Sequence, residues 1–145
     1  MNILLDTNII FSALISDKKE RLLINKIIRK RHTIVITDLV LEELNCVVER
    51  KLPQKEQKKA KKIITALSIS DFIFLKRHNL YKNNIEKAKE YISEKDAPIL
   101  AAGLQEEIDF IVSGDKDFIE NKKLYFLRKK KILTTREIIE KYEYL

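Results

Sequence analysis

The stretch Asn2-Ile3-Leu4-Leu5-Asp6-Thr7-Asn8 is the part of the sequence from which the fold can be inferred first. Its apolar run, residues 2–5, has the length of a buried strand rather than that of a helix. Similar short runs rich in β-branched and aromatic residues recur at residues 33–36, 71–75, 110–112 and 132–133. Between them, helical spacing of apolar residues predicts helices over residues 8–15, 19–31, 38–50, 54–67, 85–92 and 97–107. Short strands alternating with helices are typical of a parallel sheet covered on both faces, so the sequence predicts a three-layer α/β fold.

Composition and charge exclude several classes of protein. The 145 residues suffice for one domain, expected over residues 1–145, and the formal net charge of +7 favours a polyanionic partner. Only two glycines are present, Gly103 and Gly114, which excludes glycine-rich phosphate-binding loops. The single cysteine, Cys46, excludes an intramolecular disulfide and a zinc site of several thiolates. No apolar run approaches the roughly 20 residues of a membrane span, and the first residues lack a signal-peptide layout, so we expect a cytoplasmic protein without membrane contact.

Two acidic residues directly follow predicted strands. Asp6 follows residues 2–5, and Asp115 comes shortly after residues 110–112. In an open α/β sheet, ligands bind beyond the carboxyl ends of the strands, so both residues are candidates for a functional site. The alternative is a structural role, because aspartate commonly caps the helix that follows and stabilises it by about 1 kcal/mol.

Two further acids lie on predicted helices. At about 100° per residue, the apolar face of residues 38–50 has Glu42 roughly opposite and Glu43 at its border, so Glu43 can reach inwards over the sheet edge. Asp96 lies on the apolar stripe of its helix, where an unpaired carboxylate is very costly to bury. The alternative for Asp96 is that residues 93–96 form an N-terminal capping pattern.

These four acids, Asp6, Glu43, Asp96 and Asp115, are expected at one end of the sheet. Clustered carboxylates repel one another unless a cation joins them. Oxygen ligands without histidine or cysteine favour a hard divalent ion, Mg²⁺ or Mn²⁺. Such ions typically serve phosphoryl chemistry by activating water and neutralising developing charge, which is the chemistry that we expect here.

Four segments, in this order and spacing, resemble the motifs of PIN-domain ribonucleases, and more narrowly those of VapC-like toxins of prokaryotic toxin–antitoxin systems. They are Leu5-Asp6-Thr7-Asn8-Ile9, Thr37-Asp38-Leu39-Val40-Leu41-Glu42-Glu43-Leu44, Asp96-Ala97-Pro98-Ile99-Leu100-Ala101-Ala102 and Val112-Ser113-Gly114-Asp115-Lys116-Asp117-Phe118. The resemblance covers nearly the whole chain. It implies an α/β/α sandwich with a mostly parallel five-stranded sheet and an acidic Mg²⁺ or Mn²⁺ site that cleaves single-stranded RNA.

The resemblance also implies roles for single residues. The family's acidic quartet is matched by Asp6, Glu43, Asp96 and Asp115. An additional acid found in many members is matched by Asp117. Positions that support the acids through hydrogen bonds are matched by Asn8 and Ser113. Asp6 and Asp115 are expected as direct metal ligands. Asp96 and Glu43 are expected to complete the metal shell directly or through water, and one of them to orient or deprotonate the nucleophile. Asp117 is expected at the metal as well. The implied partners are single-stranded RNA, a small antitoxin protein and a second copy of the chain.

Basic residues cluster in residues 18–31, 50–62 and 122–131. Within the second cluster four lysines share one helical face and could follow a phosphate backbone: Lys55, Lys58, Lys59 and Lys62. The alternatives are that these lysines only solvate their helix, or that RNA follows residues 122–131 or 18–31.

Two other functions are compatible with parts of this pattern. A phosphatase of the haloacid dehalogenase type also has an aspartate after its first strand, but it generally has a second one two residues later, where this sequence has Asn8. A binding module without turnover could keep the same fold. Four clustered negative charges argue against it, because they do not help to bind a polyanion.

Overall fold

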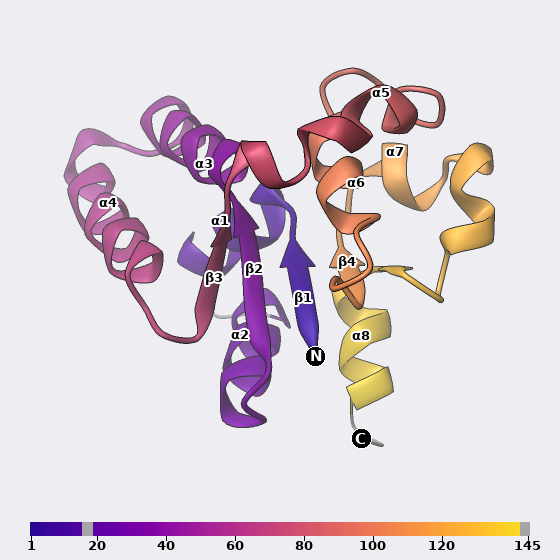
Figure 1. The fold of residues 1–145 in the computed structure, drawn as a ribbon. Coiled ribbons are helices and arrows are strands. Elements are labelled where there is room, and N and C mark those ends of the chain that lie inside the picture. Colours follow the sequence, from indigo (N-terminus) through magenta and orange to yellow (C-terminus); the bar gives the residue numbers. More distant parts are fainter. Residues whose placement is uncertain (16–18, 143–145) are drawn as a thin grey trace.

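Five parallel strands form the central sheet of the protein, whose computed structural model describes residues 1–15 and 19–142 (Figure 1). The strands are β1 (Asn2–Leu5), β2 (Thr33–Thr37), β3 (Ile73–Lys76), β4 (Phe110–Val112) and β5 (Ile132–Leu133). Their spatial order is β3-β2-β1-β4-β5, and all neighbouring pairs are parallel, which confirms the predicted architecture. Leu4 on the central strand pairs with Val35 of β2 and with Ile111 of β4. The chain order reverses between β1 and β4, and ligand sites of open α/β sheets occur at such a point.

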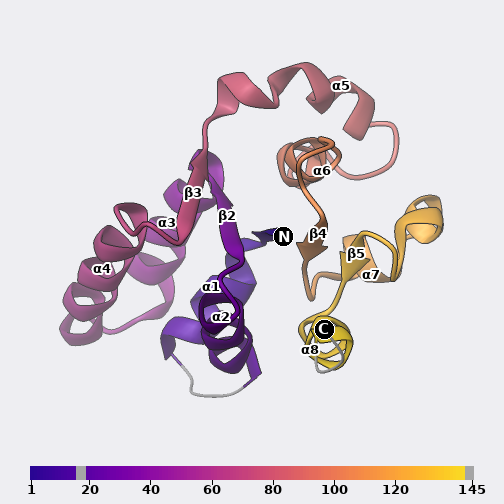
Figure 2. The same cartoon turned by 60° about the horizontal axis from the view of Figure 1, so that its bottom comes forward.

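Helices cover both faces of the sheet (Figures 1 and 2). One face carries α1 (Thr7–Ile15), α2 (Lys19–Arg29), α3 (Asp38–Lys51), α4 (Gln54–Ser68) and α8 (Thr135–Tyr142). The other face carries α5 (Ile85–Ala88) and α6 (Ala97–Gly103). The remaining short elements are α7 (Lys116–Ile119) and the 3₁₀ helices η1 (His78–Leu80), η2 (Lys82–Asn84) and η3 (Lys122–Leu127).

Apolar side chains from both layers of helices and from the sheet form one contiguous core, with Leu4, Ile111 and Leu100 fully buried. At the start of α8, Thr134 and Glu137 have the three-residue spacing of a capping box, and the structure contains this box. Glu137 N donates to Thr134 Oγ1 at 3.1 Å, and Thr134 N donates to Glu137 Oε1 at 2.9 Å. Among the described residues, none of the helices has both the length and the apolar character that crossing a membrane requires.

Two helices are shorter than the sequence predicts. α5 ends at Ala88 rather than at residue 92, because the next amide groups, such as Tyr91 N, bond three residues back in turns that redirect the chain. α6 ends at Gly103 rather than at residue 107, because the chain must turn there to enter β4, with Ile108 N bonded to the carbonyl of Gln105. Periodicity of apolar residues continues through these turns and does not distinguish them from helix.

The layer formed by α5 and α6 covers only part of its face. Over β2 and β3 that face has a groove of about 370 Å³, lined in part by Val35, Phe74, Lys76 and Glu107. Lys76 is buried and its ammonium group forms an ion pair with the exposed carboxylate of Glu107. Phe74, on the edge strand β3, is 48% exposed.

Gly103 lies where α6 comes closest to the sheet. A Cβ atom at this position would be 2.1 Å from Ile111 Cδ1 and 2.3 Å from Ile111 Cγ1, inside the core. We therefore expect Gly103→Ala to lower the free energy of unfolding by about 1–3 kcal/mol, the usual range for overpacking. Gly114→Ala is the matched control, because a Cβ there would meet nothing within 4 Å. A Gly103→Ala protein with the thermal midpoint of wild type would contradict this packing.

Candidate active site

The carboxylate of Asp6 lies at the carboxyl end of the central strand β1, where it is only 5% exposed. Its Oδ1 accepts a hydrogen bond from Thr7 N at 2.7 Å, and its Oδ2 accepts one from Ser113 Oγ at 2.8 Å. The backbone amide of Asp6 donates to the carbonyl of Val112 on β4 at 3.1 Å. Asp6 is therefore held at the boundary between β1 and β4.

Asp115 follows β4 and depends on the same serine. Ser113 Oγ, which donates to Asp6, accepts from Asp115 N at 3.1 Å. Asp115 Oδ1 caps α7 by accepting from Asp117 N at 3.0 Å, so the capping role considered for this residue does exist. The other oxygen, Oδ2, makes no hydrogen bond within the described part of the chain. One carboxylate can thus serve the helix and a ligand at once.

Asp96 occupies the N-cap position of α6, but its side chain does not cap the helix. The capping alternative for Asp96 is therefore not what the structure shows. The side chain is 6% exposed, and its Oδ2 accepts from Ser93 Oγ at 3.1 Å. The same hydroxyl lies 3.5 Å from Asp117 Oδ2. Ser93, in the loop before α6, thus connects Asp96 to the first turn of α7.

Three carboxylates meet at this point. One oxygen from each of Asp96, Asp115 and Asp117 lies within 4.8 Å of the other two. Around a Mg²⁺ ion, ligand oxygens at about 2.1 Å are separated by at most about 4.2 Å, so only a small movement would bring the three together on one ion. Asp6 is joined to this group through Ser113 and its carboxylate acts electrostatically on that of Asp96.

Glu43, on the first turns of α3, is connected to the site through Thr7. Thr7 Oγ1 donates to Glu43 Oε2 at 3.0 Å, and the charge of Glu43 acts on Asp6. Glu42 is exposed and makes no hydrogen bond among the described residues. Asn8 is exposed as well, and over residues 1–15 and 19–142 no hydrogen bond to its side chain is found. The observed hydrogen bond to Glu43 comes from Thr7, whose hydroxyl directly follows the first acid in the sequence and was not among the predicted site residues.

Burial raises the pKa of two of these acids. For Asp6, burial is the largest cause, hydrogen bonds to its carboxylate oppose it, and the charges of Asp115 and Glu43 raise the pKa further. For Asp96, burial and a hydrogen bond with Asp117 raise the pKa to about 7. Burial is thus the main cause of both raised pKa values, and the neighbouring carboxylates add to it, so a bound cation would favour the charged forms of these acids.

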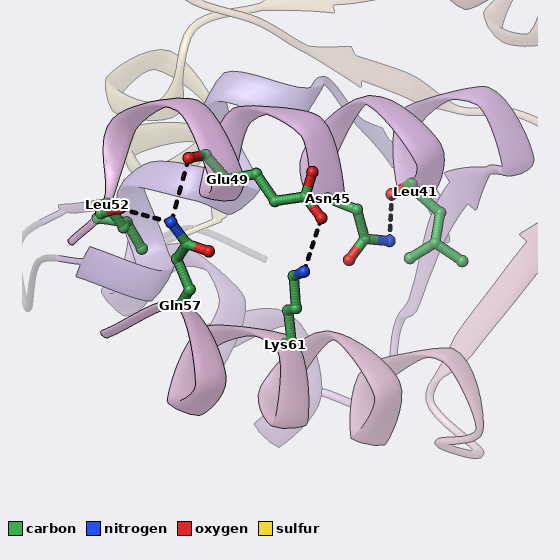
Figure 3. Close-up of polar contacts among 6 residues, drawn as sticks. All are labelled: Leu41, Asn45, Glu49, Leu52, Gln57 and Lys61. Atoms are coloured by element: carbon green, nitrogen blue, oxygen red, sulfur yellow. Dashed lines mark hydrogen bonds and ion pairs between the residues drawn. The ribbon is translucent and has the colours of Figure 1, made fainter. Parts of the chain in front are cut away.

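The four lysines of the predicted stripe, which we call the α4 stripe, are all exposed: Lys55, Lys58, Lys59 and Lys62. The side of α4 that faces α3 is formed by other residues, including Gln57 and Lys61, which bond to the backbone and carboxylate of Glu49 (Figure 3). α4 lies at the β3 edge, and α6 and α7 lie beyond β1 on the other side (Figures 1 and 2). The stripe is thus on a helix that supplies none of the acids. Of the other basic cluster, residues 18–31, Lys18 lies outside the described residues.

Three solved structures are similar to this chain over most of its length. VapC20 of Mycobacterium tuberculosis, a toxin that cleaves the sarcin–ricin loop, is 15% identical, with 79% of this chain and 91% of that chain covered and a TM-score of 0.57. VapBC2 from Rickettsia felis, bound to a DNA fragment of its promoter, is 16% identical over 92% of this chain and 98% of that chain, with a TM-score of 0.61. FitAcB from Neisseria gonorrhoeae is 17% identical over 92% and 98%, with a TM-score of 0.60. No curated protein sequence matches the chain significantly.

The three solved structures share the fold with this chain. The sequence model of the PIN domain matches residues 3–124, a range that contains every acid of the site. Because this model covers most of its length, the chain belongs to the PIN domain family.

Proposed function

We propose that this chain is a Mg²⁺- or Mn²⁺-dependent endoribonuclease that cleaves single-stranded RNA and acts as the toxin of a toxin–antitoxin pair. The observation that carries the proposal is the meeting of Asp96, Asp115 and Asp117, with Asp6 and Glu43 linked to them, at the carboxyl ends of β1 and β4. Membership of the PIN domain family and the fold shared with VapC20, a toxin that cleaves the sarcin–ricin loop, support it.

The acids fit a hard divalent cation, because all their donors are carboxylate oxygens. Asp96, Asp115 and Asp117, whose oxygens lie close together, would hold the ion. Asp6, which is joined to them through Ser113, and Glu43 would complete the site directly or through water. When bound, the ion would supply activation of water and neutralisation of the charge on the phosphate group.

Hydrogen bonds within the protein orient these acids in advance. Ser113 holds Asp6 and the loop of Asp115, and Ser93 holds Asp96 beside Asp117. A site arranged before the reaction needs little reorganisation in the transition state. Glu43 has one oxygen bonded to Thr7, while its Oε1 makes no hydrogen bond among the described residues and can accept a proton from a water molecule.

We also propose that this protein acts in the cytoplasm and binds a small antitoxin protein, with a second copy of the chain as a further partner. The shared fold with VapBC2 and FitAcB supports the antitoxin. The clustered acids argue against the alternative of a binding module without turnover, because negative charges do not help a domain to bind a polyanion.

Incubation of the purified chain with end-labelled single-stranded RNA tests the proposal. We expect internal cleavage with Mg²⁺ or Mn²⁺ and none with EDTA. Binding of RNA without cleavage under both conditions would indicate the binding module. Hydrolysis of small phosphate esters with intact RNA would indicate a phosphatase.

Glu43→Gln should reduce cleavage by about 10² or more, the usual contribution of a general base or of a comparable proton acceptor. Glutamine keeps the size of the side chain and can still accept from Thr7, so the fold should be preserved. Glu42→Gln, one position earlier on α3, is the control and should remain active. Turnover rates of both variants with Mn²⁺ give the comparison, and equal losses would remove Glu43 from the site.

Replacing the α4 stripe with glutamine tests whether it contacts RNA. If all four lysines contact phosphates, the salt dependence of binding to single strands should fall by about 3, at roughly 0.7 per phosphate, whatever the RNA sequence. Cleavage at saturating RNA should stay nearly constant, because α4 supplies none of the acids. Titrations at several salt concentrations measure this slope. An unchanged slope would mean that the stripe only solvates its helix.

A further inference from the structure

Two adjacent aromatic side chains are exposed on the surface close to the acidic site. Tyr125 and Phe126 lie on η3 and are 56% and 58% exposed, whereas Phe110 and Phe118, on the neighbouring β4 and α7, are buried. Exposed rings of this size forgo the favourable free energy of burial, so a neighbouring pair of them is typical of a surface that binds something. Leu124, in the same short helix, is fully buried and anchors it.

The surface around these rings is strongly basic. Residues 121–131 contain no acidic residue. Four of their lysines are exposed and form no ion pair among the described residues: Lys122, Lys123, Lys129 and Lys130. The other two basic residues have internal partners, because Arg128 pairs with Glu137 and Lys131 donates to the carbonyl of Gln105. The exposed charge of this segment is therefore positive and available to a polyanion.

The aromatic pair is fastened to the loop that orients the acids. The ring of Phe126 lies against that of Tyr91, with centroids 5.8 Å apart. Asn121 Nδ2 donates to the carbonyl of Tyr91 at 2.8 Å, and Asn121 Oδ1 accepts from Lys123 N at the start of η3. Tyr91 precedes Ser93 by two residues, so their Cα atoms are at most about 7 Å apart. Ser93 in turn contacts Asp96 and Asp117, which places the rings within a short stretch of single-stranded RNA from the acids.

We propose that Tyr125 and Phe126 form a stacking platform for bases of the RNA strand whose phosphodiester lies at the acidic site. This inference rests on the proposed function and extends it to the binding of substrate bases. Aromatic side chains stack on any base and lysines between them contact the phosphates, which is the usual way in which proteins bind single strands. Tyr91 contacts the ring of Phe126, and the four exposed lysines precede and follow the two rings in the sequence.

RNA is favoured over a protein as the occupant of this surface for two reasons. The segment carries exposed lysines on both sides of the rings and no acid. It is also continuous, through Asn121 and Tyr91, with the loop that holds Asp96.

Binding of a short labelled oligoribonucleotide should be compared with binding of the same backbone without bases. Without added metal, fluorescence anisotropy gives Kd values while the RNA stays intact. Phe126→Ala and Tyr125→Ala should each weaken RNA binding about tenfold, and should leave binding of the base-free backbone nearly unchanged. Phe126→Leu should be as weak as Phe126→Ala, whereas Phe126→Trp should keep wild-type affinity, because stacking needs a ring. Phe74→Ala removes a similarly exposed ring from the β3 edge and is the matched control.

Wild-type Kd values in both alanine variants, or a wild type that binds both ligands equally, would overturn the platform. A changed oligomeric state of Phe126→Ala with unchanged RNA affinity would assign the rings to a protein contact instead. Cleavage with Mn²⁺, measured in parallel, separates this inference from the proposed function. RNA binding that depends on the rings but occurs without any cleavage would support the platform and contradict the nuclease function. Normal cleavage with Kd values that the ring variants leave unchanged would support the nuclease function and contradict the platform.

Discussion

Asp6→Asn is expected to abolish RNA cleavage and to leave the fold intact. The loss should be at least about 10²-fold, as for other removals of a group that stabilises charge in the transition state. Asparagine has nearly the same size but lacks the charge that would hold a cation between β1 and β4. Its oxygen can still accept from Thr7 N, and the Ser113 hydroxyl, which now donates to Asp6, can turn to accept from the new amide. Because burial and neighbouring acids raise the pKa of Asp6, losing its charge should not destabilise the metal-free protein.

Rates of cleavage with saturating Mn²⁺ and thermal midpoints with EDTA check this prediction together. Asp71→Asn, at an exposed aspartate before β3, is the control and should behave as wild type in both measurements. A substantially active Asp6→Asn protein would show that the acid at the end of β1 is not part of the catalytic site. An unfolded variant would contradict the hydrogen-bond argument, and Asp115→Asn would then test the charge at the neighbouring strand.

Asp96→Asn is expected to stabilise the metal-free protein at pH 8 and to change little at pH 4. Burial and the hydrogen bond with Asp117 raise the pKa of Asp96 to about 7, from an ordinary value of 3.8. Between these pH values the folded protein binds a proton that the unfolded chain has lost, so the stability of wild type falls as pH rises through this window. At about 1.4 kcal/mol per pKa unit the full shift would correspond to somewhat more than about 4 kcal/mol. Because solvent partly screens the carboxylate, we expect the variant to gain about 2–4 kcal/mol once the window has been passed.

Thermal unfolding in EDTA at several pH values between 4 and 8 measures the stability of both proteins. The quantity to compare is the difference in stability between the variant and wild type at each pH. The difference matters because burial lowers the pKa of His32, which adds stability as pH rises and would mask part of the slope. Glu107 and Glu137 have lowered pKa values in both proteins, so their contribution to the pH dependence cancels in the difference. Adding Mn²⁺ at ten times its dissociation constant should stabilise wild type by about 1.4 kcal/mol. If the stability of the two proteins changed with pH in the same way, the pKa of Asp96 would not be raised in the folded protein.

Much of the fold could be predicted because short stretches of sequence specify its strands and helix caps. Each of the five strands is a short apolar run, and the capping box of Thr134 and Glu137 depends on a spacing of three residues. The assignment of Glu43 rather than Glu42 also came from local geometry, namely the angle around one helix. The structure gives the contact with Thr7 to Glu43.

The parts that could not be predicted depend on contacts between distant segments. Ser93 had been considered only as a cap, yet its hydroxyl joins Asp96 of one loop to Asp117 of another, 24 residues along the chain. Thr7 contacts Glu43 across 36 residues, and nothing in either local pattern indicates that pairing. The exposure of Tyr125 and Phe126 is also a tertiary property, because their sequence pattern alone is equally compatible with burial.

The central claim is that the acids at the carboxyl ends of β1 and β4 hold a divalent cation. Anomalous X-ray scattering from crystals of the wild-type chain soaked in Mn²⁺ tests it most directly. We expect a strong peak among the carboxylate oxygens of Asp96, Asp115 and Asp117, on the side of Asp6, at about 2.1 Å from the oxygens that bind it. No peak at this position at saturating Mn²⁺, with the carboxylates still arranged as they are here, would contradict it.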